Sequence, residues 1–318
     1  MAFLAGIDEA GYGPFVGPLS VGWSLFRVPH PGTDLWETLK DPVARKPNRK
    51  DPRLRVDDSK RVHSGPLGRQ RLERAVAAFR RVAEPRRACL ESWVASPPAL
   101  DPRFCNRAPW FFNMDVPLCP GADDGRTRLD AAAIGRSLSH GGCTLASFGA
   151  RAVPAVEWNG LLQSTGGKGE ALWKVTLEVL KHILETTGDA PLRVELDRHG
   201  GRRRYARKLL ADLGAAAVTS HGESSGGSAY TLEFEARVVE IRFGKDADSN
   251  HFPTALASLA AKQTRERMMD LFNDWFGGRI PGLRPTKGYA TDGRRWLADT
   301  LDSLVGIGVD PGAVKRNR

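Results

Sequence analysis

Two adjacent carboxylates, Asp8 and Glu9, follow a short apolar run near the start of the chain. The run Phe3 to Ile7 is apolar enough to form a buried strand, and three glycines between positions 11 and 17 allow the next stretch of backbone to turn sharply and approach a ligand closely. Because neighbouring carboxylates repel, we expect a positive group beside them, and a divalent metal ion is the favoured candidate. The alternative interpretation is a pair of solvated charges at a strand end, with glycines serving only as turn residues.

Two further acids follow predicted strands in the second half of the chain. The predicted strand 191–196 leads into Asp197, and the strand region 230–243 leads to Asp246 and Asp248. Sites commonly form at the edge of a sheet where strands end, so one of the last two acids would complete a set of four. Carboxylates without histidine or cysteine suit Mg²⁺ or Mn²⁺ rather than zinc. Two such ions, about 4 Å apart, can activate a water and stabilise the leaving oxygen in phosphodiester cleavage.

Hydrophobic periodicity predicts the elements that must position these acids. Strands are expected over 3–8, 19–28, 143–158 and 191–196, with one or two more over 230–243. Helices are expected over 67–82, 170–187, 202–213 and 254–276. The short turn between the first two strands predicts an antiparallel start, and the alternation of strands and helices in the second half predicts parallel pairing there.

Two segments read as insertions. Segment 29–55 is rich in Pro, Lys, Arg and Asp and is expected to be an exposed excursion, and segment 96–142 does not support regular structure throughout. The second contains the aromatic cluster Trp110 to Phe112. Such aromatics can stack on bases, but we expect them to anchor a long loop to its own core.

The composition of the 318 residues, 41% of them hydrophobic, is that of a soluble globular protein with one large or two ordinary domains. No stretch approaches the roughly 18 apolar residues of a membrane span, and no leader pattern is evident, so we expect a cytoplasmic monomer. Four widely spaced cysteines without a CxxC pair argue against a zinc ribbon and a disulfide scaffold; they are Cys89, Cys105, Cys119 and Cys143.

Positive charge favours a polyanionic partner. Lys and Arg outnumber Asp and Glu by 47 to 37, which gives a formal charge of +10. The basic residues cluster over 45–55, 80–87 and 202–208. An arginine-rich composition also arises from a GC-rich genome, so the charge favours a nucleic-acid partner but does not establish one.

Five segments, in this order, resemble motifs of the type 2 ribonuclease H family, the ribonuclease HII group. They are DEAGYGPFVGP at 8–18, DDSKR at 57–61, VELD at 194–197, ADSNHFPTALASLAAKQTRE at 247–266 and KGYAT at 287–291. The resemblance does not cover 29–55, 96–142 or 220–229. It implies an α/β fold of the ribonuclease H type, with a mixed five-stranded sheet flanked by helices and a C-terminal helical portion. It also implies a catalytic domain over 1–276 and a helical extension over 277–318 that carries KGYAT.

The resemblance implies roles for individual residues. The catalytic metal ligands would be Asp8, Glu9, Asp197 and Asp248, with Asp246 as the alternative fourth acid. Asp248 is preferred because the spacing to the family-like helix then requires no gap. The residues that contact the substrate would be Gly11, Tyr12, Gly13, Lys60 and Tyr289. Lys60 would contact phosphate, Tyr289 would stack on the sugar at an RNA to DNA junction, and the backbone of the glycine turn would sense the ribose 2′-OH.

The implied function is a Mg²⁺- or Mn²⁺-dependent endonuclease that hydrolyses the RNA strand of RNA–DNA hybrids or cuts at ribonucleotides embedded in DNA. Tyr12 stands where the family has arginine, and a phenol does not replace a guanidinium against phosphate. Two alternatives therefore stay open: a structure-selective nuclease that ignores the 2′-OH, and a catalytically silent nucleic-acid-binding relative. His199, close to Asp197, is either a proton-transfer group or a structural residue.

Overall fold

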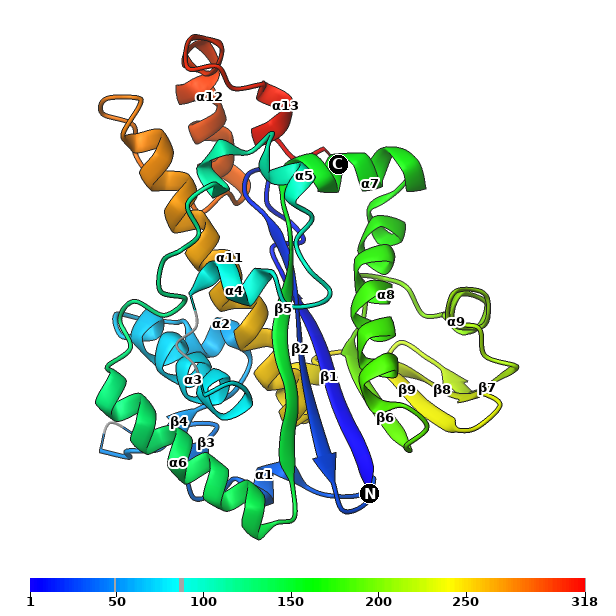
Figure 1. Cartoon of the computed structure of the whole chain (residues 1–318). Coiled ribbons are helices and arrows are strands. Elements are labelled where there is room, and N and C mark those ends of the chain that lie inside the picture. The colour runs from blue at the N-terminus through cyan, green and yellow to red at the C-terminus, as the bar shows by residue number, and fades with distance from the viewer. Residues whose placement is uncertain (49, 86–88, 318) are drawn as a thin grey trace.

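The central sheet is built on strands β1 (Ala2–Ala10) and β2 (Leu19–Val28), in a computed structural model that describes residues 1–48, 50–85 and 89–317 (Figure 1). These two strands pair antiparallel along their whole length, and β5 (Thr144–Val153) pairs antiparallel with β2. On the other side of β1, strand β6 (Leu192–Asp197) and then β9 (Val238–Gly244) are added in parallel. The predicted antiparallel start is confirmed, and the parallel pairing predicted for the second half is confirmed for β6 and β9.

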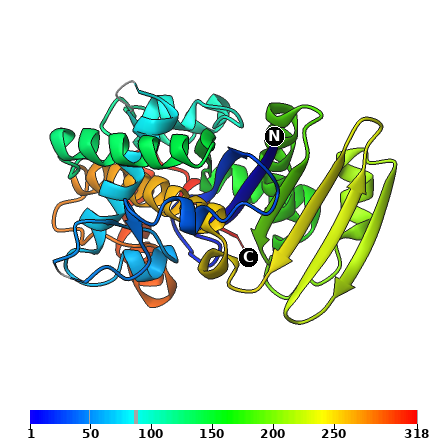
Figure 2. The ribbon, with the colours of Figure 1, turned by 90° about the horizontal axis from the view of Figure 1, so that it is seen from below.

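The fold class is confirmed as α/β with a mixed sheet flanked by helices, but the expected number of five strands is wrong. Within the described residues the sheet has seven strands in the order β5-β2-β1-β6-β9-β8-β7. The hairpin of β7 (Ala217–Glu223) and β8 (Gly227–Glu233) extends the edge beyond β9, as Figure 2 shows. Strand β7 is mostly exposed and polar, so it lacks the apolar alternation on which strand prediction depends.

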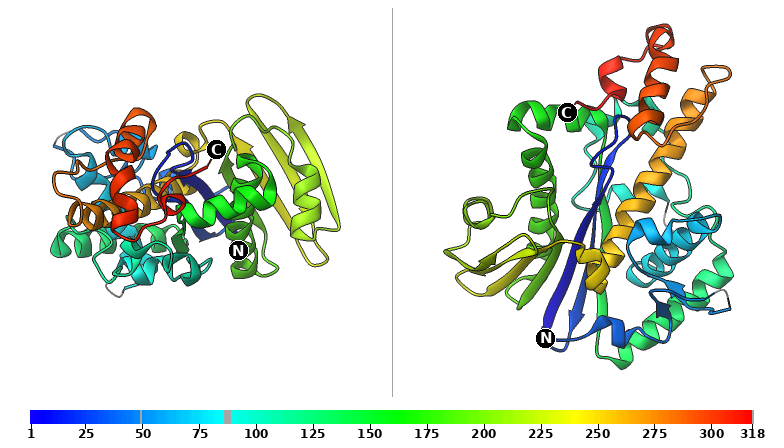
Figure 3. Two further views of the ribbon diagram at one scale, coloured as in Figure 1. Left: turned by 90° about the horizontal axis from the view of Figure 1, so that it is seen from above. Right: turned by 180° about the vertical axis from the view of Figure 1, so that it is seen from behind.

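Helices cover both faces of the sheet. The long helix α11 (Phe252–Gly277) and helix α3 (Gly68–Ala83) lie on one face, and α8 (Lys168–Thr187) and α9 (Ala206–Leu213) lie on the other (Figure 3). Each face has its own apolar core: Leu256 and Phe79 belong to the first, and Leu180 and Leu209 to the second. Helix α9 begins four residues later than predicted. None of the helices in the described ranges has the length and apolarity that a bilayer span would need.

Both expected insertions carry short regular elements. The first contains α1 (Leu35–Thr38), β3 (Val43–Ala44) and β4 (Leu54–Arg55), and α2 (Ser59–Val62) follows it. Helix α4 (Leu90–Val94) precedes the second insertion, which contains α5 (Pro102–Cys105), the 3₁₀ helix η1 (Pro109–Phe111) and α6 (Asp124–His140). Segment 29–55 is thus not simply exposed, because Leu35 and Leu54 are buried. Position 49 and positions 86–88, which belong to or adjoin two of the basic clusters, lie outside the described residues.

Helix α6, which has 17 residues, was not predicted by the sequence pattern. Asp123 caps its N-terminus, and Ile134 and Leu138 are buried one turn apart. Polar groups complete its packing: Asp130 accepts hydrogen bonds from Arg74 of α3. A helix held partly by ion pairs has a weak hydrophobic stripe, so its periodicity is hard to recognise.

The aromatic cluster of the second insertion anchors a loop, as predicted. The Trp110 ring lies 5.4 Å from that of Phe272 and 5.2 Å from that of Phe276, both on α11. Helix α12 (Ala290–Gly306) places Trp296 against the same two rings, and the short α13 (Pro311–Val314) follows. The division of the chain at residue 276 stays a prediction.

Helix α11 crosses β1 and β2 at two glycines that permit a very close approach. A Cβ atom at Gly6 would lie 2.1 Å from backbone atoms of Pro253 and Thr254, and one at Gly22 would lie 2.2 Å from the carbonyl oxygen of Ala257. Two hydrogen bonds secure this crossing. Ser24 Oγ donates to the Pro253 carbonyl over 2.8 Å, and Thr254 Oγ1 donates to the Glu195 carbonyl of β6 over 3.1 Å.

This crossing predicts that Gly22→Ala destabilises the fold. The added methyl group meets backbone rather than a movable side chain, so helix and sheet must separate, at a cost of about 1–3 kcal/mol. We expect a fall in melting temperature of at least about 2 °C by calorimetry. Gly135→Ala is the matched control, because this helical glycine of α6 has no neighbouring atom within 4 Å of the added Cβ. A melting temperature for Gly22→Ala equal to that of the control would contradict the close crossing.

Candidate functional site

Asp8 and Asp197 lie next to each other at the centre of the sheet. Strands β1 and β6 are in parallel register up to the pair Ile7 and Leu196, so the following residue on each strand is an aspartate. Asp8 is only 8% exposed, and Glu9 beside it is half-buried. The alternative of two solvated charges at a strand end is therefore wrong for Asp8.

The fourth acid is supplied by the short helix α10 (Ala247–Asn250), which leads directly into α11. Asp248 is 9% exposed, and its charge raises the pKa values of both Asp8 and Glu9. Asp246 is exposed and adopts a left-handed conformation with φ of 56°. The structure thus brings Asp248 among the buried carboxylates, whereas Asp246 acts on Asp197 from the rim.

Burial and mutual repulsion raise the pKa of each of the four acids. Burial is the largest cause in every case, and the charge of a neighbouring acid adds to it. The pKa of Glu9 rises to about 7 and that of Asp248 to about 6, while the pKa of Asp8 lies well above its ordinary value. Backbone N–H groups of Arg198 and Ala247 partly offset the rise at Asp197. The positive charge beside the cluster therefore does not balance its acids.

Lys60 is the cation that faces this cluster. Burial alone would lower the pKa of Lys60, but the carboxylates of Asp58, Asp8, Asp248 and Asp197 together raise it. The Asp58 carboxylate caps helix α2 by accepting from the Lys60 N–H over 2.8 Å, and the Ser59 N–H donates to Ser258 Oγ of α11 over 3.2 Å. The DDSKR segment is thus attached to α11, the helix that directly follows the α10 segment carrying Asp248.

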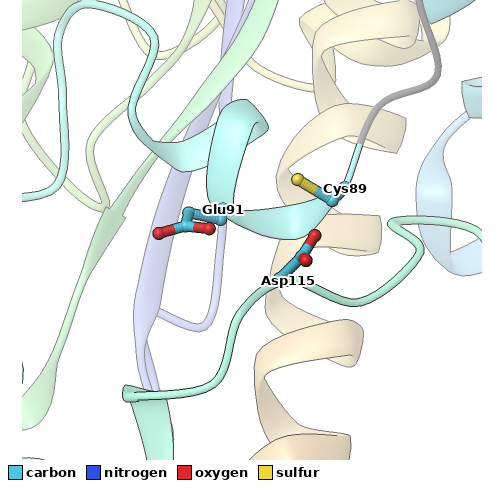
Figure 4. Close-up of side chains that lie close together, drawn as sticks. All are labelled: Cys89, Glu91 and Asp115. Carbon is cyan, nitrogen blue, oxygen red and sulfur yellow. The ribbon is translucent and has the colours of Figure 1, made fainter.

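The four acids are close enough to interact but do not converge on one point. Among the described residues, the one group of three potential ligands whose atoms lie within 4.8 Å of each other is Cys89, Glu91 and Asp115 (Figure 4). That group combines a thiol with two exposed acids, and Cys89 Sγ already accepts from the Ser92 N–H as the cap of α4. The carboxylate oxygens of the four acids suit a hard cation better.

The glycine turn and the KGYAT segment pack against each other beside the acids. Gly11 has a φ of 88°, and a Cβ there would lie 2.6 Å from Nε of Arg265, so this position requires glycine. At the exposed Gly13, by contrast, an added Cβ would meet no atom within 4 Å. Gly288 accepts from the Phe15 N–H over 2.8 Å, which docks the neighbouring Tyr289 at the same edge. Tyr289 is 38% exposed.

His199 takes a structural position. Its Nε2 lies 3.2 Å from Thr176 Oγ1, and its ring lies among those of Trp173, Tyr205 and Phe243. Burial, and then the charge of Arg202, lower the pKa of His199 to about 3, so the imidazole stays neutral. This geometry favours the structural interpretation over proton transfer.

Sequence reasoning missed Arg316 altogether. Its guanidinium hydrogen-bonds the Gly11 carbonyl across 305 positions of sequence and lies 4.5 Å above the centroid of the Trp158 ring. A lone arginine near the C-terminal end of the sequence carries no local signal for such a contact.

The raised pKa values predict that Asp248→Asn stabilises the metal-free protein at pH 8. In the wild type, stability is lost as pH rises through the folded-state pKa values of Asp248 and Glu9, about 6 and 7, because repulsive charges form in the folded state. We expect Asp248→Asn to raise the melting temperature by about 2–4 °C at pH 8 in EDTA, and by less at pH 5. Added Mn²⁺ should stabilise the wild type more than the variant.

Asp246→Asn is the matched control, because this exposed acid lies two residues away on the same segment. Its melting temperature should stay within about 1 °C of the wild type, as for most surface substitutions. A lower melting temperature for Asp248→Asn than for the wild type at pH 8 would contradict the repulsion.

Comparison with known proteins identifies only distant structural similarity. No protein-family model matches the sequence, and no curated protein is significantly similar to it. The ribonuclease HII of Archaeoglobus fulgidus, solved in complex with PCNA, is 17% identical, with 99% of this chain and 94% of that chain covered and a TM-score of 0.42. The ribonuclease H2 of Pyrococcus horikoshii OT3 is 16% identical, with 98% of this chain and 92% of that chain covered and a TM-score of 0.41. Bst-RNase HIII in complex with Mn²⁺ is 13% identical, with 99% of this chain and 66% of that chain covered and a TM-score of 0.47. Similarity at this level does not assign a family, so function is inferred from the acidic site.

Proposed function

We propose that this protein is a metal-dependent endonuclease that hydrolyses the RNA strand of RNA–DNA hybrids or cuts at ribonucleotides embedded in DNA. The observation that carries the proposal is the group of four mutually repelling carboxylates, Asp8, Glu9, Asp197 and Asp248, whose pKa values are all raised. Holding such charges together costs stability, and a bound cation would offset that cost. Function is the usual reason for such an arrangement.

Mg²⁺ or Mn²⁺ fits the chemistry of this donor set, which offers carboxylate oxygens and no sulfur or imidazole. Asp8 and Asp197 would hold it from the sheet, Glu9 from the end of β1, and Asp248 from α10. When bound, two such ions would activate water and stabilise the leaving oxygen of a phosphodiester.

The chain's own residues would bind and orient the nucleic acid. Lys60 is exposed and lies near the acids, so its ammonium group could attract a backbone phosphate from solvent. Tyr289 offers a partly exposed ring for stacking on a sugar, and the Arg265 guanidinium, 4.6 Å from the ring centroid, supports it from below. The open space at Gly13 allows a ligand to reach the backbone N–H groups of the turn, which would contact the 2′-OH. The formal charge of +10 supports a polyanionic substrate.

Asp8→Asn should reduce cleavage at least about 100-fold, because loss of even an outer partner of a metal ligand costs 10–100-fold. The measurement is single-turnover cleavage of labelled duplexes in Mg²⁺ or Mn²⁺. The duplexes are all-DNA, an RNA–DNA hybrid, and DNA with one ribonucleotide, and only the last two should be cut. Asp115→Asn, which removes an exposed acid from the Cys89 group, is the matched control and should keep full activity.

Each other outcome selects against the proposal. Equal cleavage of all-DNA duplex would replace it with a nuclease that ignores the 2′-OH, the alternative that Tyr12 in the glycine turn suggests. Salt-sensitive binding without cleavage of any duplex would indicate a silent nucleic-acid-binding protein. Unchanged cleavage by Asp8→Asn would show that the four acids take no part in catalysis.

A further inference from the structure

The end of the described chain crosses the glycine turn as a fixed strap. Lys315 forms an isolated bridge with Val16, and the Arg316 N–H donates to the Phe15 carbonyl over 2.8 Å. Asn159 of α7 (Ala155–Thr165) holds the strap from the other side: its Nδ2 donates to the Lys315 carbonyl over 2.8 Å, and its Oδ1 accepts from the Asn317 N–H over 2.8 Å. This strap places Arg316 under the turn that follows the acids.

Arg316 and its neighbour Arg265 are buried cations with unused hydrogen-bond donors. Arg316 is 2% exposed, its Nε has no partner, and it forms no ion pair with any described residue. Arg265 is fully buried; its Nη2 donates to the Lys287 carbonyl, but Nε and Nη1 have no hydrogen-bond partner. The carboxylate nearest to Arg265 is that of Glu266, 3.6 Å from Nη1. Buried charges are ordinarily paired, and Arg265 has Glu266 as its partner, so the cation that lacks an anion is Arg316.

The electrostatics of Arg316 agree with a missing anion. Burial is the main cause that lowers the pKa of Arg316 to about 9, and the positive charge of Arg265 lowers it further. The hydroxyls of Tyr289 and Tyr12 offset only part of this shift. A negative charge bound at the turn would give the Arg316 guanidinium a partner of opposite sign and would offset both effects.

The glycine turn is the route by which an anion would reach these donors. Arg316 hydrogen-bonds the Gly11 carbonyl, and Nε of Arg265 lies directly beneath Gly11. Gly13 is exposed with open space beside it. The half-buried Tyr12 makes an edge contact with Trp158, the ring on which Arg316 stacks. Tyr12 therefore lies at the boundary between solvent and the buried cation.

We propose that Arg316 is a phosphate-binding residue, which together with the Gly11 to Gly13 turn takes a backbone phosphate of bound nucleic acid beside the four acids. The proposal rests on the proposed function for the identity of its ligand, a phosphodiester. Arginine suits this role because its planar guanidinium presents several fixed donors, of which the Gly11 carbonyl uses one. The strap is then part of the substrate site rather than a passive end of the fold.

The salt dependence of binding tests the proposal. Binding of a fluorescein-labelled RNA–DNA hybrid is measured by anisotropy in Mg²⁺ between about 50 and 200 mM salt, in an Asp8→Asn background that prevents cleavage. Arg316→Gln should weaken binding and reduce the slope of log K against log salt by about 0.9, the value for one lost phosphate contact. Arg316→Lys, which keeps the charge, should retain the slope. Arg128→Gln removes the same charge from the exposed face of α6 and should change neither quantity.

Weaker binding by Arg316→Gln with an unchanged slope would overturn the proposal, because the residue would then act only by holding the Gly11 carbonyl. If Arg316→Gln does not fold, Arg316→Met replaces it, since an apolar side chain of similar length removes the charge without burying a new polar group. Failure of the parent protein to bind any hybrid would instead contradict the proposed function. A normal parent slope that Arg316→Gln leaves intact contradicts only the role of Arg316.

Discussion

The candidate site depends on the close contact between helix α11 and the glycines of β1 and β2. Side chains at Gly6 and Gly22 would overlap backbone atoms of the helix, so only glycine allows α11 to lie this near the sheet. The N-terminal end of α11 is held there by Ser24 and Thr254. Because α10 precedes α11 directly, this contact sets the distance between Asp248 and Asp8. Ser258 of the same helix accepts a hydrogen bond from the Ser59 N–H, which positions the neighbouring Lys60.

The site combines excess negative charge with excess positive charge a short distance away. Four acids with raised pKa values lie near the ends of β1 and β6, while Arg316 lies without an anionic partner among the described residues under the adjoining turn. Each group is costly to bury without a partner of the opposite sign. In the proposed complex, nucleic acid and metal ions would supply both signs, phosphate for Arg316 and cations for the acids. We infer that the free protein gives up stability at both places to favour the bound state.

Much of this arrangement could be predicted from local sequence. The first strands, β6 and α11 follow from apolar periodicity, and the positions of Asp8, Glu9 and Asp197 follow from where the predicted strands end. The strand β7 and helix α6 could not be predicted in this way, because one is exposed and the other is held partly by Arg74 and Asp130. The contact of Arg316 with Gly11 joins opposite ends of the sequence, and only the folded chain reveals it. The local sequence also left Asp246 and Asp248 as alternatives, whereas burial separates them.

The central claim is that Asp8, Glu9, Asp197 and Asp248 form one divalent-cation site. Anomalous diffraction from crystals soaked in Mn²⁺ tests it most directly, because it locates the ions without reference to activity. The account predicts strong anomalous peaks bounded by these four carboxylates, and loss of at least one peak in Asp8→Asn. Peaks only at Cys89, Glu91 and Asp115, the other group of potential ligands, or no ordered Mn²⁺ at all, would contradict it.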